Sequence, residues 1–130
     1  MIPKFRFFGK VNDGTTHMVL AESIDFKNGF IYYNYHDYTV EGGDHVYGDV
    51  IGFEDCVLMQ STGLFDINGK EIFEGDIVRM HSGELLPVKL HHGMFEPVCY
   101  YISNVFERVG NVFENPELLE HPDFREVLND

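Results

Sequence analysis

The chain has 130 residues, 44% of them hydrophobic, with 12 Phe and 7 Tyr, and its 22 acidic and 9 basic side chains give a formal net charge of −13. This content of apolar residues is enough for one hydrophobic core and excludes an intrinsically disordered chain. The basic residues are scattered singly, which argues against binding to nucleic-acid backbones and anionic membrane surfaces. No stretch approaches the roughly 20 consecutive apolar residues that a transmembrane helix needs.

The N-terminal end of the sequence predicts a β-hairpin. Residues 4–10 alternate in part between basic and aromatic side chains, as a half-buried strand does. Asn12-Asp13-Gly14 then supplies residues that are typical of a turn, and residues 16–20 have the composition of a second strand that pairs back.

A second hairpin is predicted over residues 23–35. Residues 23–27 and 30–35 flank Asn28-Gly29, and an Asn-Gly pair between two strand-like runs is the strongest short hairpin pattern. The next stretch, 36–52, is polar and rich in glycine. It predicts a long mobile or ligand-facing loop, with an irregular edge strand as the alternative.

The middle of the chain, residues 62–78, is the part richest in turn residues. It follows a short apolar strand over 56–60. Asp66-Ile67-Asn68-Gly69 predicts a tight turn, and Gly75 is expected where the backbone bends before a buried strand that begins at Asp76.

The remaining sequence predicts a third hairpin around His92-Gly93, with Pro87 and Pro97 at strand edges or ends because proline cannot donate to a ladder. A last strand is expected over 108–113. Two short helical turns follow, the first with Asn115 as its cap and Pro116 at its first helical position, and the second over 122–128.

Together these elements predict an all-β fold, or a β-dominated α+β fold. Short antiparallel strands connected by hairpins would form a barrel- or sandwich-like domain with short helical turns at its C-terminal end. We expect a single domain over residues 1–130, with the polar loop at 36–52 and a helical appendage at 115–130.

The sequence predicts no catalytic, cofactor-binding or metal-binding residue. The nearest approach to a metal-ligand pattern is His81 with His91 and His92, but adjacent residues of a strand point to opposite faces. The acidic residues of the polar stretch do not follow the alternation of a calcium loop. They are Asp37, Glu41, Asp44 and Asp49. Solvated or structural side chains are the expectation at both places, with metal binding as the alternative.

Three further groups have a structural and a chemical interpretation. Glu74 and Asp76 resemble an acid–base pair, but a carboxylate before a strand usually accepts hydrogen bonds from nearby backbone N–H groups. Cys56 and Cys99 lie in apolar surroundings, which indicates buried free thiols in a reducing cytoplasm, with one disulfide as the alternative. Cys56 has no His near it in sequence to make it a nucleophile.

The aromatic segment 30–38 is the remaining candidate for a binding site. Its rings can stack on single-stranded bases, as they do in many nucleic-acid-binding proteins. Because no Lys or Arg is interleaved with them, a core edge or a subunit contact is the favoured interpretation. The rings are those of Phe30, Tyr32, Tyr33, Tyr35 and Tyr38.

Three blocks of the sequence resemble the YopX family of phage and prophage proteins. They are Lys4-Phe5-Arg6, the segment from Leu58 to Val78, which contains Gly63-Leu64-Phe65-Asp66-Ile67-Asn68-Gly69-Lys70, and the segment from Val109 to Leu119. Their order and spacing agree from about Lys4 to Leu119. The resemblance implies a small, largely β protein of phages and prophages of mainly Gram-positive bacteria, similar to proteins that form oligomers. It implies no activity and no functional residue.

Two functional hypotheses follow. The first is a non-enzymatic accessory protein that acts by protein–protein contact in the host cytoplasm as a homo-oligomer, with a host or phage protein as a further partner. The alternative is a nucleic-acid-related role, either as an acidic mimic of DNA or as a weak single-strand binder through residues 30–38. We expect no cofactor, no membrane contact and no enzyme activity.

Overall fold

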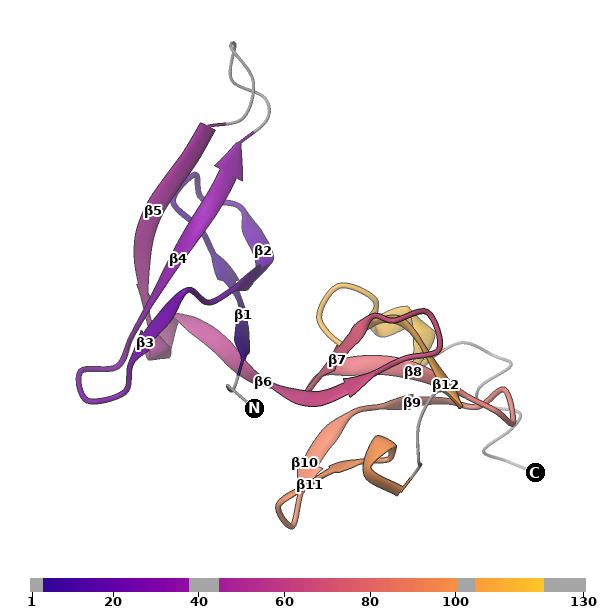
Figure 1. Ribbon diagram of the computed structural model, residues 1–130. Helices are drawn as coiled ribbons and strands as arrows, with labels where there is room; N and C mark the ends of the chain where they lie inside the picture. The colour runs from indigo at the N-terminus through magenta and orange to yellow at the C-terminus, as the bar shows by residue number, and fades with distance from the viewer. Residues whose placement is uncertain (1–3, 38–44, 101–104, 121–130) are drawn as a thin grey trace. The chain divides into compact units, whose positions relative to one another are not determined.

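The computed structural model describes residues 4–37, 45–100 and 105–120, which form antiparallel strands and three short 3₁₀ turns (Figure 1). The predicted all-β fold is therefore confirmed. The chain divides into two compact units, an N-terminal unit of Lys4–Met59 and a C-terminal unit of Met1–Pro3 with Gln60–Asp130. The expectation of one domain stays a prediction, because a compact unit is a region of dense packing and not a segment shown to fold separately.

The N-terminal unit contains a hairpin and a three-stranded sheet. The first two strands pair with each other, and the fourth strand lies between the third and the fifth. The elements are β1 (Phe5–Lys10), β2 (Thr16–Leu20), β3 (Ser23–Asp25), β4 (Phe30–Asp37), β5 (His45–Gly52) and the 3₁₀ turn η1 (Phe53–Asp55).

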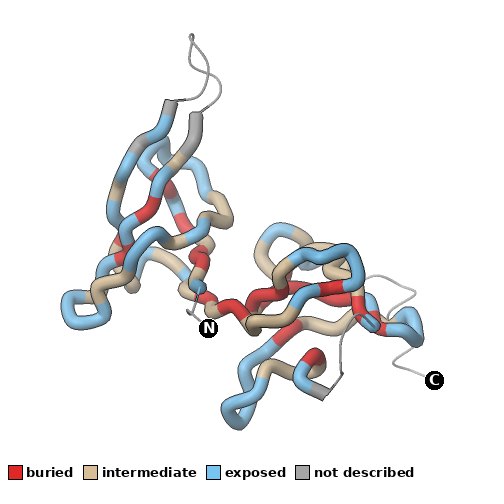
Figure 2. The backbone as a smooth tube through the Cα atoms, viewed as in Figure 1, coloured by how far each residue is buried: buried red, intermediate tan, exposed pale blue. Residues whose placement is uncertain are grey.

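The core of this unit is aromatic and aliphatic, and alternation along β4 supplies much of it. Ile31 and Tyr33 are buried while Phe30 and Tyr32, which alternate with them, are exposed, as the changing colours along this strand show (Figure 2). The Tyr33 ring meets the ring of Phe7 edge to face, with centroids 5.1 Å apart. The buried cluster consists of Phe7, Val11, Ile31, Tyr33 and Ile51.

Both hairpins predicted in this unit are confirmed. In the first, the Gly14 N–H donates to the Val11 carbonyl at 2.9 Å, and Gly14 has a φ of 86°. In the second, Asp25 pairs with Phe30, so the turn is longer than Asn28-Gly29 alone. The Asp25 carboxylate accepts from the backbone N–H groups within this turn, and Gly29 closes it with a bond to the Asp25 carbonyl.

The predicted long loop over 36–52 is wrong for the part that the structure describes. Residues 45–52 form β5, whose register with β4 extends from Phe30–Gly52 to Asp37–His45. The alternative of an edge strand is the correct one, since β5 ends the sheet order β3-β4-β5. The polar residues and glycines of this stretch indicated a loop. An edge strand with one open face also tolerates such residues, so they do not exclude a strand. Glu41 and Asp44 lie outside the described residues.

The C-terminal unit is built from short strands that follow β6 (Cys56–Phe65), a strand that crosses the boundary at Met59. In one sheet β8 lies between β12 and β9, and β10 pairs with β11 in a separate hairpin. Its elements are β7 (Glu71–Phe73), β8 (Asp76–Met80), β9 (Leu85–Pro87), β10 (Lys89–His91), β11 (Met94–Glu96), η2 (Val98–Tyr100), β12 (Phe106–Asn111) and η3 (Pro116–Leu118). Its buried cluster is Ile72, Val78, Met80, Val88, Val98 and Phe106.

The carboxylate of Asp66 holds the predicted turn of the middle block in place. Asp66 is 1% exposed, and its Oδ1 accepts from the N–H groups of Asn68 at 2.9 Å and Lys70 at 2.8 Å. Its Oδ2 accepts from the Arg108 N–H at 2.8 Å, which ties the turn to β12. Burial by itself raises the pKa of this carboxyl, but the three N–H donors and the Lys70 charge outweigh it and hold the pKa below its usual value.

Gly75 occupies the bend that the sequence predicts, with a φ of 90°. Its N–H donates to the Val88 carbonyl and its carbonyl accepts from the Val112 N–H, both at 2.8 Å. Next to it, buried Asp76 accepts at 2.8 Å from the Phe73 N–H, which confirms the structural role expected for this carboxylate. Three segments of the C-terminal unit therefore meet at this bend.

The hairpin at His92-Gly93 is confirmed, and both of its turn residues have positive φ angles, 52° and 77°. Pro87 lies in the edge strand β9, and Pro97 follows the end of β11, as the missing proline donor requires.

The predicted capping role of Asn115 is wrong. Asn115 precedes η3, but its side chain makes no capping bond, and its Oδ1 instead accepts from the Asn111 N–H at 3.2 Å. The Asn111 side chain in turn accepts from the Phe113 and Glu114 N–H groups, which lie between the two asparagines. Pro116 does begin the turn, and the second helical turn predicted over 122–128 lies outside the described residues.

Replacing Gly75 tests the importance of the bend. We expect Gly75→Val to lower the free energy of unfolding by about 1–3 kcal/mol or more, because a branched residue is strained at this φ. Asp37→Ala, at the end of β4, should change it by less than about 0.5 kcal/mol. Equal stability of the two variants in chemical denaturation would contradict this role of Gly75.

Replacing Asp66 tests the buried carboxylate. Asp66→Asn should cost roughly 2–3 kcal/mol at neutral pH, because charge-assisted hydrogen bonds are lost. The folded pKa is depressed, so the contribution of the carboxylate is complete above its unfolded pKa near about 3.9 and is lost as the pH falls through the folded value. The gap in melting temperature between wild type and variant should therefore close in acid. A gap that stays constant down to the acid limit of folding would contradict this assignment.

Candidate functional site

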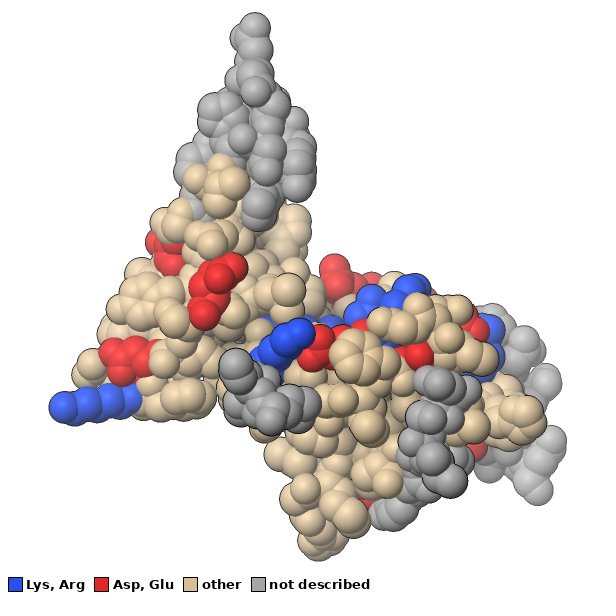
Figure 3. Space-filling model, viewed as in Figure 1, with Lys and Arg blue, Asp and Glu red and all other residues tan. Residues whose placement is uncertain are grey.

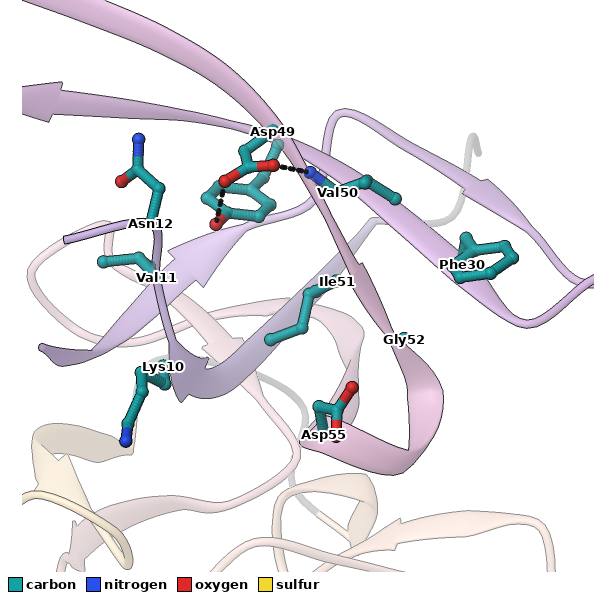
Figure 4. A pocket seen from close by; sticks show the side chains of 10 residues that line it. Lys10, Val11, Asn12, Phe30, Asp49, Val50, Ile51, Gly52 and Asp55 are labelled. Carbon is teal, nitrogen blue, oxygen red and sulfur yellow. Dashed lines mark hydrogen bonds between the residues drawn. The ribbon is translucent and has the colours of Figure 1, made fainter. Parts of the chain in front are cut away.

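The described part of the N-terminal unit contains a groove between the free edge of β5 and the end of β1 (Figure 4). Its volume is about 660 Å³, within the range of ligand pockets. Polar groups on its walls come from Lys10 at the end of β1, Asn12 after that strand, Asp49 in β5 and Asp55 in η1. These residues are distant in sequence, so no local motif could have indicated the groove.

One wall of the groove is fixed by hydrogen bonds of Asp49. Its Oδ1 accepts from the Val50 N–H at 2.8 Å, and its Oδ2 faces the Tyr33 hydroxyl at 3.5 Å (Figure 4). Burial, followed by the Asp49 charge, raises the pKa of Tyr33, so its phenol stays neutral and donates. The groove thus offers fixed polar groups for binding, and its phenol is a poor base.

Cys56 has the chemistry of a structural thiol. Burial, followed by the nearby Asp55 charge, raises the pKa of Cys56, and its Sγ donates to the Gly52 carbonyl at 3.6 Å. A protonated thiol is a weak nucleophile. Cys56 and Cys99 are both free, so the alternative of a disulfide between them is wrong, but Cys99 is exposed and not buried as the sequence suggests.

The side chains of His91 and His92 do not point to opposite faces, as the alternation of a strand predicts. His92 lies in a left-handed turn and not in the strand, so its ring centroid is 4.0 Å from that of His91. His91 Nδ1 lies 2.6 Å from an oxygen of Glu96, while His81 is exposed in the turn after β8. Across the ranges that the structure describes, no three His, Cys, Asp or Glu side chains come together in a way that could hold a metal ion.

The aromatic segment 30–38 is divided between two faces of the sheet. Tyr33 belongs to the core, and Tyr35 donates to Asp13 Oδ2 at 3.1 Å and lies against the His17 ring. Phe30 and Tyr32 remain exposed, at 43% and 46%. Tyr38 lies outside the described residues. A continuous row of rings for stacking on bases is therefore not formed by the described part of this segment.

Phe30 and Tyr32 belong to an exposed apolar surface of the three-stranded sheet, which we call the open face. Antiparallel partners point to the same side, so Val50 lies beside Tyr32 and Gly48 beside Asn34 on this surface. Val46 and Val50 are 54% and 44% exposed. The open face consists of Phe30, Tyr32 and Asn34 of β4 with Val46, Gly48, Val50 and Gly52 of β5.

The seven residues of the open face are themselves uncharged, but carboxylates border them. Asp25 of β3 is the register partner of Phe30, and Asp55 Oδ2 lies 3.4 Å from the position that a Cβ of Gly52 would take. On the side of the molecule shown in Figure 3, Lys and Arg lie in small separate groups between acidic and uncharged residues. The view agrees with the scattered basic residues of the sequence. Within the described ranges no helix has the length and apolar character needed to span a bilayer.

Comparisons with known proteins agree with the resemblance noted in the sequence. A family model described as "YopX protein" matches residues 4–120. The solved crystal structure of protein EF1440 from Enterococcus faecalis is similar, with a TM-score of 0.61 and 26% sequence identity over 92% of this chain and 99% of that chain. A search of curated proteins gives no match.

The environment of Cys56 gives a measurable expectation. At neutral pH, iodoacetamide should label Cys99 at least about tenfold faster than Cys56, because burial and a raised pKa leave little Cys56 thiolate. Mass spectrometry of peptides from partly labelled native protein measures both rates. In denaturant the two rates should converge, and equal labelling of the native protein would contradict the assignment.

Proposed function

The chain belongs to the YopX protein family, and we propose that it is a phage- or prophage-encoded accessory protein that acts by protein–protein contact in the host cytoplasm, without enzyme activity. In this proposal it works as a homo-oligomer that contacts a host or phage protein. The observation that carries the proposal is the open face, a surface with exposed aromatic and aliphatic side chains.

The physical argument is that exposed apolar area costs free energy until it is covered. Exposed apolar side chains are common one by one, but contiguous groups of them mark sites of interaction. On the open face Tyr32 and Val50 are direct neighbours across two strands, and Phe30 and Val46 continue the surface along them. Tyrosine and phenylalanine are also enriched at protein interfaces, where a ring contributes a large contact area.

The polar groups of the groove support binding rather than catalysis. The thiol nearest to it is held protonated, and the phenol in its wall is held neutral. The Asp49 carboxylate already accepts from Val50 and Tyr33. These restraints give the groove a fixed shape without an activated nucleophile or base among the groups they involve.

A nucleic-acid-related role is the alternative. Its single-strand form has little support, because Phe30 and Tyr32 are the exposed rings of the described segment and the open face has no Lys or Arg. Its mimicry form draws on the net charge of −13.

Light scattering during size-exclusion chromatography tests the assembly. We expect a mass greater than that of one chain, and we expect the fraction of chains in the oligomer to rise with protein concentration. A strictly monomeric mass at every concentration would contradict the homo-oligomer.

Capture from lysate of phage-bearing host cells tests the partner. A protein partner should be retained after nuclease treatment, and the purified chain should show no binding to single-stranded oligonucleotides at low salt. Salt-sensitive oligonucleotide binding would favour the alternative. Competition for a host DNA-binding protein without binding to DNA would favour mimicry.

A further inference from the structure

The free edge of β5 presents a defined set of backbone groups, and two hydrogen bonds show which ones face it. β5 is the last strand of its sheet within the described ranges (Figure 1). The Tyr32 carbonyl in β4 accepts from the Glu22 N–H at 2.8 Å, so the backbone groups of Tyr32 point toward β3. The Phe53 N–H donates to the Gly29 carbonyl at 2.9 Å, so Gly29 points the other way and has the opposite phase. Tyr32 and its partner Val50 therefore form a non-hydrogen-bonded pair.

Every second residue of β5 thus directs its N–H and C=O away from β4, because the two kinds of pair alternate along an antiparallel ladder. These residues include Val46, Gly48 and Val50. The Val50 N–H donates to the Asp49 carboxylate of its own strand at 2.8 Å. Among the described residues, the other edge-facing backbone groups of these three have no hydrogen-bond partner, so they can pair with a further strand.

Gly48 lies in the middle of this edge, where nothing within the described chain requires glycine. Its φ is outside the left-handed region. A Cβ added there would have Asn34 Oδ1 as its nearest neighbour, at an ordinary contact distance of 3.7 Å. Glycine inside a strand often marks a place where another backbone approaches closely. Its position at the unpaired edge favours a strand as the group that approaches.

The groove adds side-chain contacts along the same edge. Its walls carry the carboxylates of Asp49 and Asp55 and the ammonium group of Lys10 (Figure 4). Side chains alternate between the two faces of a strand. A strand that pairs with β5 would therefore direct every second side chain toward the groove and the others toward Val46 and Val50 on the open face.

The charges at this edge favour basic side chains from another protein. The two carboxylates of the groove outnumber its one ammonium group, and the whole chain carries a net charge of −13. An ionised carboxylate has about four acceptor sites, so Asp49 can accept from a ligand in addition to Val50. A second copy would bring the same carboxylates and the same net charge to the edge, which opposes pairing between two β5 strands.

We propose that the free edge of β5 binds an extended segment of another protein as an added strand, and that this segment alternates apolar residues with lysine or arginine. Hydrogen bonds to Val46 and Gly48 hold its backbone, and the alternation of its side chains gives specificity. Its basic residues reach Asp49 and Asp55, while its apolar residues extend the open face. The proposal rests on the protein–protein contact of the proposed function, and it names the class of partner and the surface that binds it.

The first test uses a peptide of the length of β5, eight residues of alternating valine and lysine with blocked ends. We expect saturable binding in isothermal titration calorimetry at about 0.15 M salt, where exposed charges more than about 8 Å apart are largely screened. The same peptide with methylated backbone nitrogens keeps its side chains and charge but cannot donate to β5, so it should bind at least about tenfold more weakly. A peptide of alternating valine and glutamate should also bind at least about tenfold more weakly.

Variants of the chain test the edge and the groove separately. Gly48→Pro removes the N–H that faces the edge but no bond of the ladder with β4, and edge strands tolerate proline in this orientation. It should weaken binding of the valine–lysine peptide at least about fivefold, while Gly48→Ala, which keeps the N–H, should stay within about twofold. Asp55→Asn should weaken binding about two- to fivefold. Glu54→Gln is its matched control, because Glu54 is exposed in the same turn and does not line the groove, and it should change the affinity by less than about 1.5-fold.

Absence of saturable binding by the valine–lysine peptide overturns the proposal. Equal binding of the methylated peptide also overturns it, because attraction between charges without strand pairing would explain that result. Equal binding of the valine–glutamate peptide overturns the basic partner, and equal effects of Asp55→Asn and Glu54→Gln overturn the role of the groove. Circular dichroism verifies folding, and the methylated peptide provides the test on the wild-type chain if Gly48→Pro does not fold.

Capture from host lysate separates this proposal from the proposed function. A partner protein retained equally by wild type and Gly48→Pro would overturn the β5 edge and leave the proposed function standing. Failure to retain any protein would contradict the proposed function, on which this proposal rests.

Discussion

The alternation of side chains along β4 is the constraint on which the N-terminal unit depends. One face of this strand supplies Ile31 and Tyr33 to the core, and the opposite face presents Phe30 and Tyr32 to solvent. A shift of one residue in its register would exchange these two sets. The register with β3 and β5 therefore determines both the stability of the unit and the composition of the open face.

Much of the fold could be predicted from the sequence because its turns are specified locally. Gly14, Gly69, Gly75 and Gly93 all have positive φ angles, and a residue without a Cβ is the natural choice at each. The edge strand β5 was harder to predict, because pairing with β4 and not its own composition makes it a strand. Asn115 was also predicted wrongly, because its side chain accepts from the Asn111 N–H, four residues before it, and not from the N–H groups of the helical turn that follows.

The candidate site was predictable only in part. The sequence indicated that segment 30–38 would serve a core edge or a contact, and the structure divides it between the core and the open face. The groove was not predictable, since Lys10, Asp49 and Asp55 come from two different sheets and a 3₁₀ turn and are brought together only by folding. The rings of His91 and His92 were predicted to lie on opposite faces because side chains alternate along a strand. His92 lies in a turn, where this alternation does not apply, and the two rings are neighbours. Local reasoning thus identified turns better than the neighbours brought together by folding.

The bond between Asp66 and the Arg108 N–H has a consequence for the order of synthesis. Its two ends are 42 residues apart, so the buried carboxylate lacks one donor until β12 has left the ribosome. In contrast, the buried cluster of the N-terminal unit ends at Ile51, and the partly buried side chains that pack against it end at Leu58. A nascent chain that stalls before Arg108 would hold an incompletely paired carboxylate, and such a fragment should be a preferred substrate for the proteases of the cell.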